Sequence, residues 1–177
     1  MLYEEGKFYH IYNRGCDKNK IFQDSNDYGR LLKIIANSDY KKYVDIIAYA
    51  LMPNHYHILV KQTSNQPAYK WIKYIFNTYV QYYNHRHNRS GTLFEGRAKV
   101  KEIYKSDYLG LITHYIHTNP KTELQKKYSS ISSLSCNPII NKEFYLEIFD
   151  GLEDYYASFE RYQLDKHAKE EAERVLL

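Results

Sequence analysis

The sequence is poor in cysteine and lacks any long apolar run. Cys16 and Cys136 are its only cysteines among 177 residues, and their separation matches no metal-binding spacing, which favours a reducing environment and two inert thiols. No apolar stretch approaches the ~20 residues that a membrane-spanning helix requires. The N-terminus shows no basic region followed by an apolar core, so the sequence predicts neither a membrane span nor a signal peptide.

Repeats and low-complexity segments are also lacking, and the chain has the length of one domain with a substantial core. The net charge of +4 is mild and excludes no class of protein. Its distribution is more informative, because a basic tract lies in the middle of the chain, just before the helix that carries Tyr115. This tract contains His85, Arg86, His87, Arg89, Arg97, Lys99, Lys101 and Lys105. On charge alone a solvated basic loop is the commoner explanation, and a phosphate-binding surface is the alternative.

Two histidines one residue apart stand at the start of an apolar run. Residues 46–51 and 55–60 have the composition of β-strands, and Pro53-Asn54 between them is typical of a turn. Alternate residues of a strand point to the same face, so His55 and His57 would present two imidazoles side by side. Imidazole is a common ligand of divalent metals. Such a pair is by itself more often made of surface or half-buried histidines.

A helix is predicted downstream of this pair. Ser106 suits an N-cap, and Pro120 ends the pattern. One stripe of this helix consists of Tyr108, Leu111, Ile112, Tyr115 and Asn119. Tyr115 and Asn119 are four residues apart and share a face, which places a candidate nucleophile and a candidate oxygen ligand on adjacent turns. The alternatives are a core aromatic for Tyr115 and a helix-ending residue for Asn119.

The predicted order of elements is β-α-β-β-α-β-α. We expect strands at 7–13, 43–51, 55–61 and 98–104, and helices at 24–37, 68–85 and 106–118. This order predicts an α+β protein of the ferredoxin-like, split βαβ class, with an antiparallel sheet and helices on one face. The Ser-rich segment 129–137 is expected to be a loop, followed by helices at 141–149 and 151–174, the last of which packs only partly. We therefore divide the chain into a catalytic domain, 1–122, and a helical C-terminal extension, 123–177.

Four motifs occur in a fixed order. They are His10-Ile11-Tyr12-Asn13-Arg14-Gly15, then Met52-Pro53-Asn54-His55-Tyr56-His57, then Gly91-Thr92-Leu93-Phe94-Glu95-Gly96-Arg97, and last Tyr115-Ile116-His117-Thr118-Asn119-Pro120. In this order they resemble the single-tyrosine transposases of the HUH endonuclease superfamily. The REP-associated tyrosine transposases are the most similar branch, because Tyr128-Ser129-Ser130 and a helical tail follow the tyrosine helix. The resemblance extends over residues 7 to 130.

The resemblance implies a metal-dependent single-stranded DNA endonuclease and strand transferase. Tyr115 would attack a backbone phosphorus and retain the 5′-phosphate as a phosphotyrosine intermediate. His55, His57 and Asn119 would hold a divalent metal, Mg²⁺ or Mn²⁺. Some relatives carry Gln at the last of these positions, so Asn119 is a departure with a shorter reach. His114 and His117 lie about 100° and 200° around the helix from Tyr115 and are expected to face elsewhere.

The implied partner is a repeat-derived hairpin of single-stranded DNA, bound by a monomer or a homodimer at no membrane. We expect a cytoplasmic, nucleoid-associated bacterial protein. The residues expected to contact DNA are Asn13, Arg14, Arg86, Arg89, Arg97, Lys99 and Lys101. Two rival classes remain open. A ferredoxin-like module can bind nucleic acid without catalysis, and a metal-dependent phosphoesterase can use water while Tyr115 is structural.

Overall fold

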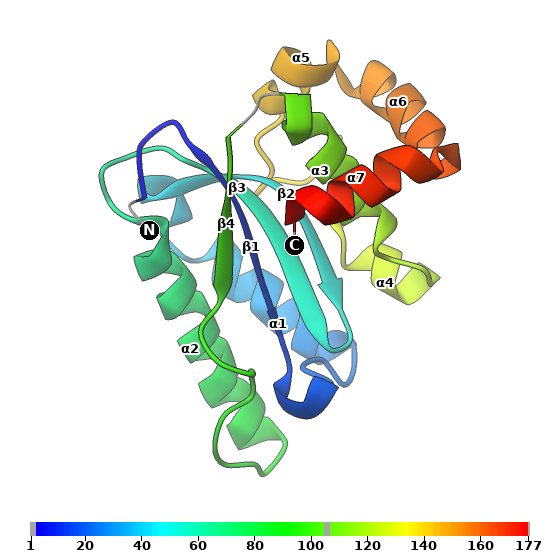
Figure 1. Ribbon diagram of the computed structural model, residues 1–177. Helices are drawn as coiled ribbons and strands as arrows, with labels where there is room; N and C mark the ends of the chain where they lie inside the picture. Colours follow the sequence, from blue (N-terminus) through cyan, green and yellow to red (C-terminus); the bar gives the residue numbers. More distant parts are fainter. Residues whose placement is uncertain (1–2, 105–106, 177) are drawn as a thin grey trace.

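The computed structural model describes residues 3–104 and 107–176 (Figure 1). The first part of the chain forms β1 (Phe8–Arg14), α1 (Ser25–Ala36), β2 (Val44–Met52), β3 (His55–Gln62), α2 (Ala68–Arg86), β4 (Lys99–Ile103) and α3 (Asp107–Thr118). The C-terminal part forms α4 (Glu123–Lys127), α5 (Glu143–Phe149), α6 (Leu152–Leu164) and α7 (Lys166–Leu176). Short 3-10 helices are η1 (Cys16–Lys18), η2 (Tyr40–Lys42) and η3 (Ser130–Ser133). The predicted β-α-β-β-α-β-α order is confirmed. Ser106, the predicted cap of α3, lies outside the described residues.

The four strands form one sheet in the order β2-β3-β1-β4, and each neighbouring pair is antiparallel. Because β3 lies between β1 and β2 and opposes both, β1 and β2 run in the same direction, which is the split βαβ arrangement. A two-residue turn, Pro53-Asn54, pairs Met52 with His55. The α+β, ferredoxin-like prediction is therefore confirmed. No helix in the described part of the chain combines the length and apolar character needed to cross a bilayer.

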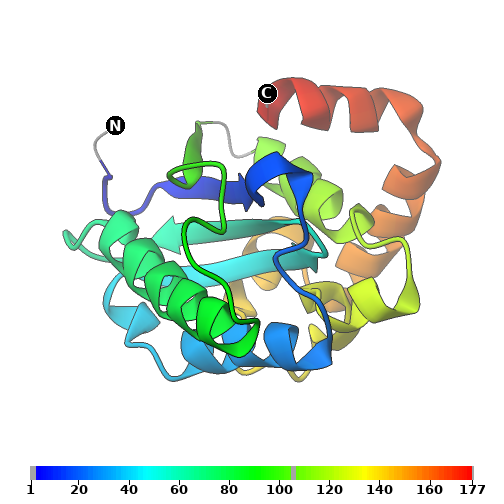
Figure 2. The ribbon, with the colours of Figure 1, turned by 90° about the horizontal axis from the view of Figure 1, so that it is seen from below.

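Helices cover both faces of the sheet, which corrects the expectation that they lie on one. α1 and α2 lie on one side, and α3 lies on the other together with the C-terminal helices (Figure 2). Alternation along β3 explains the division. Tyr56 points towards α2, where its ring lies 4.1 Å from that of Phe76 between centroids. His57 points the opposite way, and its ring lies 5.7 Å from that of Tyr115 on α3. The histidine face is thus the α3 face.

The C-terminal extension covers the outer edge of β2. The Leu51 N–H donates to the Tyr128 carbonyl at 3.1 Å, and the Asn141 N–H donates to the Ile46 carbonyl at 2.8 Å. The Tyr145 hydroxyl donates to the Ile47 carbonyl at 2.9 Å. An uncovered edge strand presents unpaired backbone groups to other chains. The extension satisfies these groups here, so it packs on the sheet; the division at residue 122 stays a prediction.

One expectation for the extension is wrong. The helix predicted over 151–174 is two helices that break at Asp165, where the backbone is extended and the side chain accepts from the Ala168 N–H at 3.1 Å. That bond caps the start of α7. The last helix packs only partly, as expected, since Ala172 and Leu176 are buried and most of its other residues are exposed. Its contacts are mainly with α3 and α6.

His114 and His117 face the extension and not the Tyr115 side of α3, as predicted. The Oγ atom of Ser130 lies 2.6 Å from Nε2 of His117, whose other nitrogen is hydrogen-bonded to the Tyr155 hydroxyl. His114 Nε2 lies 3.1 Å from the hydroxyl of Ser158. Burial lowers the pKa of His117 to about 3 and that of His114 to about 4. Both imidazoles are therefore neutral in the folded protein at neutral pH.

We expect the free energy of unfolding to decrease on mild acidification. In the unfolded chain these histidines bind a proton near pH 6.5, whereas in the folded protein their pKa is depressed. Their contribution is complete above pH 6.5 and is lost as the pH falls towards 4 and 3, at up to ~1.4 kcal/mol per pH unit for each histidine. Urea unfolding between pH 7.5 and 5 measures this slope. His117→Gln should make it shallower, and an unchanged slope would contradict the assignment.

Candidate active site

His55 and His57 lie at the start of β3 and share one face, as their spacing predicts. Their ring centroids are 5.2 Å apart and their planes are nearly perpendicular, at 87°. His55 Nδ1 lies 2.7 Å from Asn54 Oδ1. Asn54 Nδ2 donates to the Lys18 carbonyl at 3.2 Å, which fixes the orientation of the amide. Because an amide oxygen only accepts, His55 carries its proton on Nδ1. Nε2 of His55 keeps a lone pair that can bind a metal.

Tyr115 and Asn119 reach the histidines from the last turns of α3. The Tyr115 ring meets the His57 ring edge-on, with planes at 89°. Asn119 Nδ2 donates to the Tyr115 carbonyl at 2.8 Å, and the Asn119 side chain also lies close enough to the His55 ring and the Tyr115 hydroxyl to oppose the effect of burial on the pKa of each. Asn119 therefore joins the two elements that carry the candidate residues. All four residues predicted for the catalytic centre lie together.

Burial controls the charge of this centre. It lowers the pKa of His55 and holds the pKa of His57 well below the usual range. Both imidazoles are neutral at pH 7, which is the form that ligates metals. Burial raises the pKa of Tyr115, with smaller increases from Glu173 and Tyr12, while the hydrogen bond from Asn119 lowers it. The phenol thus holds its proton at neutral pH.

The donor atoms fit a divalent cation. Each histidine uses Nδ1 for a hydrogen bond within the protein. His57 Nδ1 lies 2.9 Å from His10 Nε2, and His55 Nδ1 is hydrogen-bonded to Asn54. Nε2 of each histidine and the amide oxygen of Asn119 are thus the candidate ligand atoms, provided that His57 carries its proton on Nδ1. Among residues 3–104 and 107–176, no three His, Cys, Asp or Glu side chains are arranged to hold a metal. Asn119 is therefore the candidate for a third protein ligand beside the two histidines.

Comparison with known proteins identifies the family. Residues 5–119 match the family described as "Transposase IS200 like". The chain belongs to this family. The matched span contains the histidine pair, the loop at 91–97, Tyr115 and Asn119, and it confirms the prediction of a tyrosine transposase. A comparison with curated proteins found no significant match.

A solved structure supports the fold of this IS200-like transposase. The chain is similar to a REP-associated tyrosine transposase whose structure was determined bound to a REP hairpin, with a TM-score of 0.57 and 13% sequence identity. The similarity covers 80% of this chain and 86% of the other. At this identity the similarity shows the fold, and the roles of individual residues stay predictions.

A hollow of about 360 Å³ lies beside the histidines of this transposase, and the residues around it include Tyr12, Arg14 and Lys99. Tyr12 is half-buried on β1 directly opposite His57. Lys99 Nζ lies 5.9 Å from the centre of the Tyr12 ring. An aromatic ring between a cation and the candidate metal ligands is suited to stack on an unpaired base. Tyr12 was not among the predicted site residues, although alternation along β1 places it on the same face as Arg14.

Three of the residues expected to contact DNA, Asn13, Arg14 and Lys99, line this hollow, and Arg97 and Lys101 belong to the segments that carry or precede them. Arg14 forms an ion pair with Glu95 at 2.9 Å, and its side chain stays half exposed. Lys99 lines the hollow, and Lys101 is half-buried opposite His10. The buried Asn13 donates through Nδ2 to the Gly96 carbonyl at 3.0 Å, so it holds the 91–97 loop in place. Arg97, next in this loop, is exposed.

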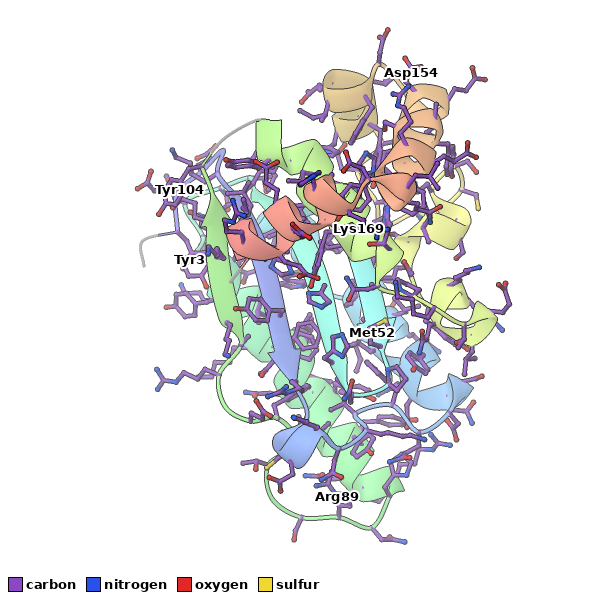
Figure 3. All side chains as sticks on the ribbon, turned by 45° about the vertical axis from the view of Figure 1, so that its right-hand side comes forward. Tyr3, Met52, Arg89, Tyr104, Asp154 and Lys169 are labelled. Atoms are coloured by element: carbon purple, nitrogen blue, oxygen red, sulfur yellow. The ribbon has the colours of Figure 1, made fainter. Side chains whose placement is uncertain are left out.

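Arg86 and Arg89 lie elsewhere in the transposase. The Arg86 guanidinium is held by Asp24 at 2.6 Å and by the fully buried Asp27 at 2.5 Å. It therefore joins α2 to the start of α1 and has little charge to offer a phosphate. Arg89 lies over the Tyr83 ring at 5.5 Å, and Figure 3 shows it at the lower end of the molecule, well below Lys169. The basic tract is divided between two regions.

The extension contributes to the surroundings of Tyr115. A second hollow, of about 490 Å³, is lined by Tyr115 and Asn119 together with Tyr162, Lys169 and Glu173 of α6 and α7. The transposase therefore presents its tyrosine between the core sheet and a helix from the far end of the chain. Sequence reasoning missed these residues because only long-range packing brings α7 to α3.

Proposed function

We propose that this IS200-like transposase cleaves and rejoins single-stranded DNA through a covalent bond between Tyr115 and a 5′-phosphate. A divalent metal held by His55, His57 and Asn119 would assist the reaction. The observation that carries the proposal is the convergence of these residues: the Tyr115 ring meets the His57 ring edge-on at 5.7 Å between centroids, and the Asn119 side chain lies close enough to the His55 ring and the Tyr115 hydroxyl to affect the pKa of both groups.

The chemistry follows from the groups present. The Tyr115 oxygen attacks the scissile phosphorus as the phenol loses its proton, and the bond to the 3′-oxygen breaks. The 3′-hydroxyl leaves with a proton, and the 5′-phosphate stays on the tyrosine. An incoming 3′-hydroxyl reverses these steps and releases the tyrosine, so the phosphodiester energy is conserved and no ATP is needed. Asn119 positions the attacking hydroxyl throughout.

A metal bound at the histidines would polarise the scissile phosphate and neutralise part of its charge. Mg²⁺ or Mn²⁺ suits an oxygen-rich site that includes a phosphate, while a histidine pair can also accept Zn²⁺. The neutral imidazoles and the free Nε2 of His55 support this part of the proposal.

We propose a DNA surface smaller than the sequence suggested. It consists of Arg14, Arg97, Lys99 and Lys101, with the Tyr12 ring between them and the catalytic centre. Arg86 is excluded because two carboxylates already neutralise it. The solved relative bound to a REP hairpin supports a hairpin as the DNA substrate. A cytoplasmic, nucleoid-associated location follows from that substrate, and a monomeric or homodimeric state remains part of the proposal.

Transfer of labelled DNA to the protein tests this function. The substrate is a single strand that carries a hairpin and unpaired flanks, incubated with Mn²⁺ and resolved on a denaturing gel. A label on the 3′ end should migrate with the protein, and a label on the 5′ end should not, because the tyrosine retains the 5′-phosphate of the downstream piece. Cleavage without transfer would indicate a phosphoesterase that uses water. Binding without cleavage would indicate a non-catalytic module.

We expect Arg97→Ala with Lys99→Ala to weaken DNA binding for many sequences alike. Removing one phosphate-binding cation should reduce the slope of log K against log salt by about 0.7 for a single strand, so removing both should reduce it by about 1.4. Fluorescence anisotropy at several salt concentrations measures the slope. Arg89→Ala is the matched control, since it removes an exposed cation far from the centre and should leave the slope unchanged. Equal slopes for the double variant and wild type would refute this surface.

A further inference from the structure

A third histidine lies beneath the candidate metal ligands. His10 stands on the middle of β1 with 1% of its surface exposed. Its Nε2 lies 2.9 Å from Nδ1 of His57. The two ring planes are within 7° of parallel and their centroids are 5.1 Å apart. One proton must lie between the two nitrogen atoms for this contact to be a hydrogen bond.

The position of that proton decides what His57 can do. If His57 donates from Nδ1, its Nε2 has a lone pair for a metal. If His10 donates instead, His57 carries its proton on Nε2 and cannot act as a ligand. Histidines that ligate metals generally donate their other N–H to a fixed acceptor, which sets the tautomer and the direction of the ring. His10 Nε2 is in the place of that acceptor.

His10 is a poor choice for packing alone. Its second nitrogen, Nδ1, is buried and has no hydrogen-bond partner among the described residues. A buried polar atom without a partner costs free energy, whichever tautomer is present. The residue directly opposite on β3 is the apolar Leu59, so a leucine at position 10 would suit the surroundings better. The imidazole is therefore best explained by what its other nitrogen does for His57.

We propose that His10 is a positioning residue that accepts a hydrogen bond from His57 Nδ1 and so directs His57 Nε2 towards the metal. This inference rests on the proposed metal site. His10 touches neither the metal nor the DNA, and its effect is on the affinity for the metal. Loss of such a partner typically weakens metal binding by about 10- to 100-fold.

Two substitutions separate this role from packing. His10→Leu removes the acceptor and the orphaned His10 nitrogen but leaves Nδ1 of the buried His57 without its partner. The two changes oppose each other, so the protein should stay close to wild type in thermal stability while its affinity for Mn²⁺ falls by about 10- to 100-fold. His10→Gln places an amide oxygen near the position of Nε2 and should restore most of that affinity. His57→Ala shows the level expected when a ligand is removed. Calorimetric titration with Mn²⁺ on metal-free protein, without DNA, gives the affinities.

The outcomes distinguish the two proposals. If wild type binds Mn²⁺, His57→Ala does not, and His10→Leu binds as tightly as wild type, the role of His10 is refuted and the metal site stands. If wild type and His57→Ala bind alike, the metal site is refuted and the role of His10 with it. The ¹⁵N shifts of His57 in the wild-type protein with Mg²⁺ provide a check that needs no variant. A proton on Nδ1 supports the inference, and a proton on Nε2 overturns it.

Discussion

Tyr115→Phe is expected to abolish the covalent adduct while the protein still folds and still binds hairpin DNA. Phenylalanine keeps the ring that meets His57 edge-on but has no oxygen to attack phosphorus. Adduct formation should fall by at least ~10³-fold, because nothing replaces a covalent nucleophile. Loss of the hydrogen bond to Asn119 should change the free energy of unfolding by only about 1 kcal/mol. Denaturing gels with 3′-labelled DNA measure the adduct.

Tyr12→Phe is the matched control for this variant. Tyr12 is a second phenol near Tyr115, on the sheet side of the site, and it raises the pKa of Tyr115 slightly. The control should form adduct at close to the wild-type rate and bind DNA as well, since the stacking ring remains. If Tyr115→Phe forms the adduct normally, another residue is the nucleophile. If Tyr12→Phe then loses the adduct, that residue is Tyr12.

His55→Ala and His57→Ala, alone or together, are expected to abolish cleavage with little effect on DNA binding. The imidazoles would hold the metal, whereas the proposed phosphate contacts come from Arg14, Arg97 and Lys99. Cleavage should fall by at least ~10²-fold, and the affinity for the hairpin should change by no more than roughly twofold. Rates at several Mn²⁺ concentrations and anisotropy in chelator measure the two effects.

Of the two single variants, His55→Ala is the more decisive test of the metal site. His55 is only half-buried, so its loss disturbs packing less than the loss of His57. His85→Ala controls for the general effect of removing an imidazole, because His85 is exposed on α2 and should be silent. Cleavage that persists in both histidine variants in the presence of chelator would rule out the metal site.

The sequence predicts what depends on local pattern. Alternation placed His55 and His57 on one face, and the helical repeat placed Tyr115 and Asn119 together; the structure brings both pairs into contact. The prediction of one helix over 151–174 also relied on local pattern, and it is wrong. The apolar residues of this segment are spaced for a helix throughout, and the break depends on one capping bond from Asp165.

Local sequence pattern does not predict strand register or the contacts between residues that are far apart in the chain. His10 and Tyr12 were visible in the first motif, yet nothing in the sequence states that β1 pairs with β3 so that Tyr12 opposes His57. Arg86 was predicted to contact DNA, but its guanidinium is paired with Asp24 and Asp27, about sixty residues away in the sequence. Its charge is visible in the sequence, and its neutralisation is a property of the tertiary structure.

The covering of β2 by the extension restricts how two copies of this chain could associate. Continuous sheets between protomers require a free strand edge, and the segments around Tyr128 and Asn141 occupy the one at β2. The other edge, β4, is five residues long and carries Lys99 and Lys101, a combination that disfavours strand-to-strand pairing. A homodimer would therefore have to join through helices or loops. A chain shortened before Tyr128 would expose the β2 edge and is expected to aggregate, so the sheet and the candidate active site are best studied with the extension attached.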